Sequence, residues 1–81
     1  MIKIKVKCFS QVKYSLGVEE LTFELEDGTD VSDLEKIVRE KALGKLDGVT
    51  LRTAINRKYI SDNAILNDGD EVAFIPPVQG G

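Results

Sequence analysis

The opening segment constrains the fold most, because its side chains alternate strictly in polarity. The apolar positions are Ile2, Ile4, Val6 and Cys8, and the positions between them are Lys3, Lys5 and Lys7. A period of two predicts a β-strand over residues 2–9 with one buried face and one solvated face. Cys8 lies on the apolar face, so we interpret it as a small buried hydrophobe rather than a reactive thiol.

A second alternating segment follows at residues 20–26. Leu21, Phe23 and Leu25 share its apolar face, and glutamates occupy much of the other. The two strands are expected to pair as a hairpin, with residues 10–18 as a long connecting loop. Lysines of the first strand would then face glutamates of the second across the solvated side, an arrangement that stabilises strand pairs.

One good helix is predicted, over residues 30–43. Asp30 suits the N-cap, and Asp33 three residues later resembles a capping box. Apolar side chains recur at helical spacing and form one stripe: Val31, Leu34, Ile37, Val38 and Ala42. Gly44 fits the left-handed position just beyond the helix.

The remaining segments read as short strands separated by turns. Strands are expected at 51–55, 59–60 and 72–75, with a tight turn at Asn56-Arg57-Lys58 and another at 67–70. One helix and four or five strands predict an α+β fold, in which the helix packs across one face of the sheet. We expect one domain over residues 1–75, followed by a flexible tail over residues 76–81.

Composition excludes several classes of function. The chain has no histidine, so it cannot contain a Ser-His or Cys-His nucleophile pair or a histidine-based metal site. Its net charge of -3 argues against nucleic acid as a partner. No apolar run is long enough for a membrane span. The acidic run near Gly69 has the wrong spacing for calcium, because Ala64 and Leu66 would occupy ligand positions. We therefore predict no bound metal and no bound cofactor.

The single cysteine bears on location. Cys8 cannot form an internal disulfide, which fits a reducing compartment. The alternating first residues also lack the unbroken apolar region of a signal peptide. We expect a cytoplasmic protein.

The C-terminal tail carries the strongest functional signal. The last strand runs into Pro76-Pro77-Val78-Gln79-Gly80-Gly81. Proline cannot continue a central strand and stiffens the chain as it leaves the domain. Glycine has no Cβ, so a Gly-Gly end fits a narrow channel. The terminal carboxylate is ionised at neutral pH and can attack the α-phosphate of ATP to become an acyl-adenylate. The catalytic residues for that step would belong to a partner.

The sequence resembles the ubiquitin-like β-grasp sulfur carriers, and specifically the small subunit of molybdopterin synthase. The resemblance is most specific over residues 67–81, where Asp-Gly-Asp-Glu-Val-Ala and Pro-Pro-Val-Gln-Gly-Gly are similar to the family's usual ending. Ala54-Ile55-Asn56 and Gln11-Val12 are also similar. Sulfur carriers for thiazole share Gly-Gly but usually lack the two prolines.

The resemblance implies a ubiquitin-like β-grasp with a mixed sheet, and it implies a reaction cycle. An E1-like enzyme, using ATP, would adenylate Gly81, and a sulfurtransferase would help convert it to a thiocarboxylate. The tail would then enter the large synthase subunit, in a heterotetramer, and donate sulfur to the dithiolene of molybdopterin. Gly80, Gln79 and Val78 would line the channel, while Pro76 and Pro77 would set the exit angle.

The exposed face of the sheet is the expected docking surface for that partner. Ile75, Ala73 and Tyr59 would supply its apolar part, since Val72 and Phe74 should point into the core. Lys7 would lie beside them, where family members commonly have an aromatic residue.

Other functions remain open from the sequence. One is a ubiquitin-like modifier joined through Gly81 to lysines of other proteins. A second is sulfur supply to another product, such as thiazole or thiolated tRNA. A third is an interaction domain with an inert tail. An independent enzyme is disfavoured because no catalytic constellation is evident.

Overall fold

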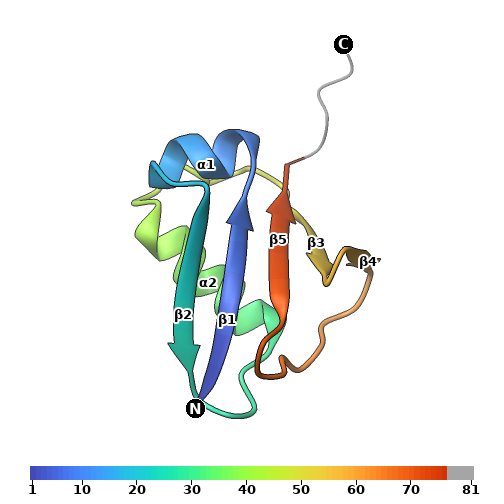
Figure 1. Ribbon diagram of the computed structural model, residues 1–81. Coiled ribbons are helices and arrows are strands. Elements are labelled where there is room, and N and C mark those ends of the chain that lie inside the picture. The colour runs from blue at the N-terminus through green and yellow to red at the C-terminus, as the bar shows by residue number, and fades with distance from the viewer. Residues whose placement is uncertain (77–81) are drawn as a thin grey trace.

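The computed structural model describes residues 1–76, and its elements are shown in Figure 1. Five strands and two helices make up this part of the chain. In order they are β1 (Ile2–Cys8), α1 (Ser10–Leu16), β2 (Glu20–Leu25), α2 (Val31–Lys41), β3 (Arg52–Ile55), β4 (Lys58–Ile60) and β5 (Glu71–Ile75). The predicted tail residues Pro77, Val78, Gln79, Gly80 and Gly81 lie outside the described residues.

The strands form one mixed sheet in the order β2-β1-β5-β3-β4. β1 and β5 run parallel at its centre, and the neighbouring pairs are antiparallel. Figure 1 shows these two strands pointing the same way, with β2 on one side and β3 and β4 on the other. The predicted α+β class is therefore confirmed.

The predicted hairpin between the first two strands is also confirmed. Lys3 faces Glu24 and Lys7 faces Glu20 across the β1–β2 ladder. The Lys7 ammonium lies 3.0 Å from a carboxylate oxygen of Glu20, and the Lys5 ammonium lies 3.9 Å from the other. The register that places the apolar side chains in the core thus also brings opposite charges together on the solvated face.

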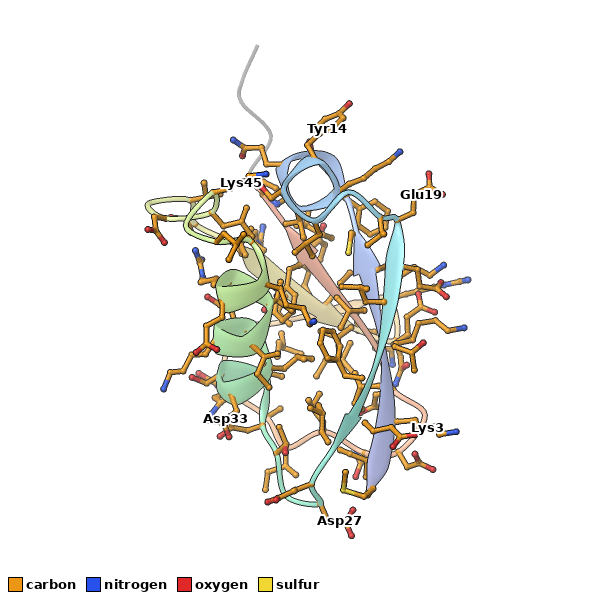
Figure 2. The ribbon with its side chains drawn as sticks, turned by 90° about the vertical axis from the view of Figure 1, so that its left-hand side faces the viewer. Lys3, Tyr14, Glu19, Asp27, Asp33 and Lys45 are labelled. Carbon is orange, nitrogen blue, oxygen red and sulfur yellow. The ribbon has the colours of Figure 1, made fainter. Side chains whose placement is uncertain are left out.

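α2 packs across one face of the sheet and leaves the other face uncovered, as Figure 2 shows from the side. Its predicted stripe is confirmed, since Val31, Leu34, Val38 and Ala42 are buried and Ile37 packs at the margin. Opposite them, the core side of the sheet contributes these buried residues: Ile2, Ile4, Val6, Cys8, Leu25, Val72 and Phe74.

Both ends of α2 are held by specific hydrogen bonds. The Asp30 carboxylate accepts from the backbone N–H of Asp33 at 2.8 Å, as predicted for an N-cap. Beyond the other end, Arg39 donates to the carbonyl oxygens of Leu46 and Val49, each at 2.7 Å. Gly44 has a φ of 86°, so its backbone is left-handed as predicted. These contacts fold the loop after α2 back onto the helix.

The prediction of a plain loop over residues 10–18 is wrong, because Ser10–Leu16 forms helix α1. Val12 is fully buried in the core and Leu16 packs against it, which supplies the stabilisation that the local sequence lacks. Gly17 ends the helix with a φ of 76°, and its N–H bonds to the Lys13 carbonyl at 2.7 Å. Seven residues are too few to show a clear 3.6-residue period.

The predicted turn between β3 and β4 is confirmed. Asn56 and Arg57 both have positive φ, 50° and 71°, the conformation that suits a two-residue hairpin. The Asn56 side chain accepts from the Glu71 N–H and donates to Asp70, so this turn is tied to the start of β5. Within residues 1–76, neither helix has the length and apolar composition needed to cross a membrane.

Core packing predicts a large loss of stability when a buried side chain of β5 is shortened. Phe74→Ala should lower the free energy of unfolding by about 3–5 kcal/mol, because the Phe74 side chain is fully buried in the core. Urea titration followed by circular dichroism measures this loss. Tyr14→Ala is the control, since Tyr14 is 81% exposed and its removal should change the free energy by less than about 0.5 kcal/mol. Equal effects of both changes would contradict this account of the core.

The N-cap of α2 predicts a pH dependence. The N–H of Asp33 and the side-chain amide of Asn63 hold the pKa of Asp30 below its ordinary value. The stability from ionised Asp30 is therefore fully present above the unfolded-state pKa of about 3.9, and is lost as pH falls through the lower folded-state pKa.

Asp30→Ser tests this dependence, because serine keeps a cap acceptor but does not titrate in this range. The wild-type chain should exceed the variant in urea midpoint at about pH 6, and the difference should shrink towards about pH 2. A difference that does not change between these pH values would show that the carboxylate charge is not involved.

Candidate functional site

β5 connects the core of the domain to the C-terminal tail. Its side chains alternate as predicted, with Val72 and Phe74 fully buried and Ala73 and Ile75 half-buried on the opposite face. Pro76, which follows directly, is itself buried. The point where the chain leaves the domain is thus fixed by a central strand, which pairs with a strand on each side, and by the buried Pro76.

The uncovered face of the sheet brings the predicted docking residues together. In register across the strands, Lys7 lies opposite Ala73, Ala73 opposite Ala54, and Ala54 opposite Tyr59. Ile75 lies two residues beyond Ala73 on the same face of β5. We call the surface made by these five residues the open patch. All five line a groove of about 660 Å³.

The sequence did not predict two parts of this groove. Ala54 lies on the uncovered face but is itself buried by its neighbours, and its face follows from the β3–β5 register, which the sequence does not give. The second is the wall formed by α1 and the residue before it, with Phe9, Ser10, Lys13 and Tyr14. Val12, Leu16 and Gly17 were the signal for α1: an i, i+4 apolar pair followed by a left-handed glycine.

Exposed aromatic side chains line this groove and make it suitable for binding another protein. Tyr59 is 58% exposed and Phe9 is 47% exposed. Tyr14 points away from the body at the top of α1, at the end of the molecule that contains Lys45 (Figure 2). Partly apolar surfaces with tyrosine at their centre are typical of protein interfaces.

Lys7 is held at the edge of the open patch by its ion pair with Glu20. The hydrogen bond and the charge of Glu20 raise the pKa of Lys7, and the same bond lowers the pKa of Glu20. Both groups therefore stay charged at neutral pH and neutralise one another. Lys7 presents its carbon chain and a paired ammonium rather than a free charge.

The acidic run before β5 has a structural role. Asp68 accepts from the Lys3 N–H at 2.7 Å, and Asp70 accepts from the Asn67 N–H at 2.9 Å and from Asn56. These carboxylates close the turn that returns the chain to the sheet. Among the described residues, no three His, Cys, Asp or Glu side chains gather where they could hold a metal ion.

The sequence matches the model of the ThiS family over residues 6–81, which is nearly all of the chain. The chain belongs to the ThiS family. One relative, the molybdopterin synthase sulfur carrier subunit of Chlamydomonas reinhardtii, is 44% identical over 99% of this chain and 100% of its own length. The resemblance inferred from the C-terminal motif is therefore confirmed.

Solved structures agree with this membership. A chain from the complex of subunits 1 and 2 of the molybdopterin-converting factor of Helicobacter pylori is 29% identical, with a TM-score of 0.70, and the match covers 99% of this chain and 100% of that one. Small archaeal modifier protein 1 of Methanosarcina acetivorans is 27% identical, with a TM-score of 0.77 and coverage of 100% and 98%. The fold of this ThiS-family chain is the expected ubiquitin-like β-grasp.

Cys8 is the one thiol of this ThiS-family chain, and its position argues against a role in carrying sulfur. It is 3% exposed on the core side of β1. Burial, and next the charge of Glu20, raise the pKa of the Cys8 thiol, so little of the reactive thiolate is present.

We predict that Cys8 reacts slowly with an alkylating reagent in the native chain and rapidly in denaturant. The rates are measured by intact mass at timed intervals, with a free thiol peptide as the reference. Native labelling as fast as that of the peptide would contradict the buried assignment.

Proposed function

We propose that this chain is the sulfur carrier subunit of a molybdopterin synthase, and that its C-terminal Gly81 carries the sulfur. The observation that supports this most strongly is the 44% identity to a carrier subunit of that name over 99% of this chain and 100% of the relative. The ThiS-family match over residues 6–81 includes the Pro-Pro-Val-Gln-Gly-Gly ending.

The chemistry of the proposal follows from a terminal carboxylate. A carboxylate oxygen of Gly81 attacks the α-phosphate of ATP on an E1-like enzyme, and pyrophosphate leaves. A sulfur nucleophile then displaces AMP. If a sulfurtransferase supplies a persulfide, the product is an acyl disulfide, which a thiol reduces to the thiocarboxylate. Transfer of that sulfur to the pterin precursor and hydrolysis return the carboxylate.

The chain itself supplies position rather than catalysis. β5 and buried Pro76 set where the tail begins, and the open patch lies directly beside that point. We propose that the open patch docks on the large synthase subunit, with Val78, Gln79 and Gly80 passing into its channel. The Helicobacter pylori relative comes from a complex of two subunits, which supports a large partner for this chain.

The proposed cycle also favours a location. It consumes ATP and maintains a reduced sulfur group, and Cys8 is a free thiol. We therefore propose that the chain acts in the cytoplasm.

The second candidate is a ubiquitin-like modifier. The 27% identity to a small archaeal modifier protein over the whole chain favours this alternative. Both functions begin with adenylation of the terminal glycine, and they separate at the next step. A sulfur nucleophile produces a thiocarboxylate, whereas a lysine amine produces an amide bond to another protein.

Intact mass spectrometry tests the carrier function. After incubation with the E1-like enzyme, ATP and a sulfurtransferase with its sulfur donor, the chain should gain the mass difference between one oxygen and one sulfur. Fragment masses should place the change at Gly81. The Cys8→Ala chain should gain the same mass, because the buried thiol takes no part.

Two tail variants serve as controls. Removing Gly81, or adding one residue after it, should abolish the mass gain while leaving the unfolding midpoint unchanged, because the last residue of a domain generally contributes little to its packing. No gain in the wild-type chain, with a competent carrier reacting alongside, would contradict the proposal. Conjugates in cell extract that depend on Gly81 would support the modifier instead.

A further inference from the structure

The arginines of this chain fall into two kinds. Arg39 is used within the domain, where it bonds to Glu35 at 2.9 Å and to two backbone carbonyls. Arg52 and Arg57 are exposed. Within residues 1–76 neither guanidinium forms an ion pair or donates a side-chain hydrogen bond. Apart from a contact of Arg52 with Tyr59, their charges are therefore not used in this part of the chain.

Both of these arginines stand at the rim of the open patch. Arg52 faces Ile75 across the β3–β5 ladder, and its guanidinium lies 4.7 Å from the centre of the Tyr59 ring. Arg57 occupies the second position of the β3–β4 turn and lines the same groove as Ala73 and Tyr59. The apolar centre of the open patch is thus bordered by two unpaired cations.

The carboxylates near the open patch do not cancel these charges. Glu20 is paired with Lys7, and Glu19 is paired with Lys13 at 3.0 Å. Glu71 lines the groove and forms no ion pair within residues 1–76. A second groove, which holds Arg52, also meets Tyr59. Six cations and four carboxylates line the two grooves, a net charge of +2: Lys7, Lys13, Lys36, Arg39, Arg52 and Arg57 against Glu19, Glu35, Asp62 and Glu71. The whole chain carries a net charge of -3, so this surface departs in sign from the rest.

We propose that Arg52 and Arg57 bind carboxylates of the partner, so that the open patch selects a large synthase subunit with an acidic rim around an apolar centre. This inference rests on the proposed function for the identity of the partner. The arginines would supply specificity and association rate, and Ala73, Ile75 and Tyr59 would supply buried apolar area.

The geometry of Arg52 favours this role over a chance surface charge. The Arg52 guanidinium lies 4.7 Å from the centre of the Tyr59 ring, and this cation–π contact uses none of its N–H groups, so a carboxylate can accept two of them. The contact also limits the side-chain freedom that binding would otherwise remove. A partner that covered these arginines without supplying an acid would leave buried charges unpaired, which strongly disfavours association.

Binding to the large synthase subunit from the same organism tests the proposal. The dissociation constant of the full chain would be measured by titration calorimetry at roughly 50 mM and 500 mM salt, since screening weakens exposed ion pairs. Arg52→Gln and Arg57→Gln should each weaken binding about 10-fold at low salt, and the double variant should lose most of the salt dependence. Arg57→Lys should keep the salt dependence, because the charge remains.

Lys41→Gln is the matched control, because it removes an exposed positive charge from the end of α2 beside Phe23 of β2, at the sheet edge opposite β4, and Lys41 lines neither groove around Tyr59. Its affinity and salt dependence should equal those of the wild-type chain. Thermal unfolding of every variant checks that the fold is retained.

The outcomes separate the two proposals. If the wild-type chain binds and the arginine variants match Lys41→Gln, the acidic-partner inference is overturned while the carrier function stands. If the wild-type chain binds no large subunit at all, the proposed function fails and the inference fails with it. Weakened binding confined to the arginine variants supports the inference.

Discussion

The parallel pairing of β1 with β5 is the interaction on which the rest of the structure depends. It joins the first strand of the chain to the last, so that Val6 lies beside Val72 and Cys8 beside Phe74. Those side chains form the sheet side of the core, onto which α2 packs. Closing a loop of this length costs conformational entropy before any contact repays it. The remaining strands then add to the two sides of this central pair.

This pairing also determines where the chain leaves the domain. A C-terminal strand at the edge of a sheet could fray together with its tail. β5 is instead hydrogen-bonded on both sides, by β1 and by β3 (Figure 1). The chain therefore leaves the domain from a strand inside the sheet, followed by a buried proline. A carrier whose terminus must reach a partner's active site benefits from such a fixed starting point.

The two faces of the sheet differ because, of the two helices in residues 1–76, α2 alone is long enough to cover a face. α2 buries the apolar side, and the opposite side keeps a mixture of ion pairs, small residues and one tyrosine. Lys7 and Glu20 satisfy each other there, whereas Arg52 and Arg57 have no acidic partner within residues 1–76. The same surface can thus remain soluble in the free chain and present specific charges to another protein.

Periodicity and local chemistry determined much of this protein from sequence. Alternation placed Ile4 and Lys7 on opposite faces, and the helical stripe and Asp30 located α2. The Gly-Gly ending is the basis of the chemistry that we propose for the terminus. These features depend on neighbours within a few residues. Helix α1 was missed because its stability comes from burying Val12 in a core assembled from distant strands. The row from Lys7 through Ala73 and Ala54 to Tyr59, and the arginines beside it, were decided only by tertiary structure. Strand pairing between residues far apart in the chain sets that register, and a local pattern identifies a face but not its neighbour.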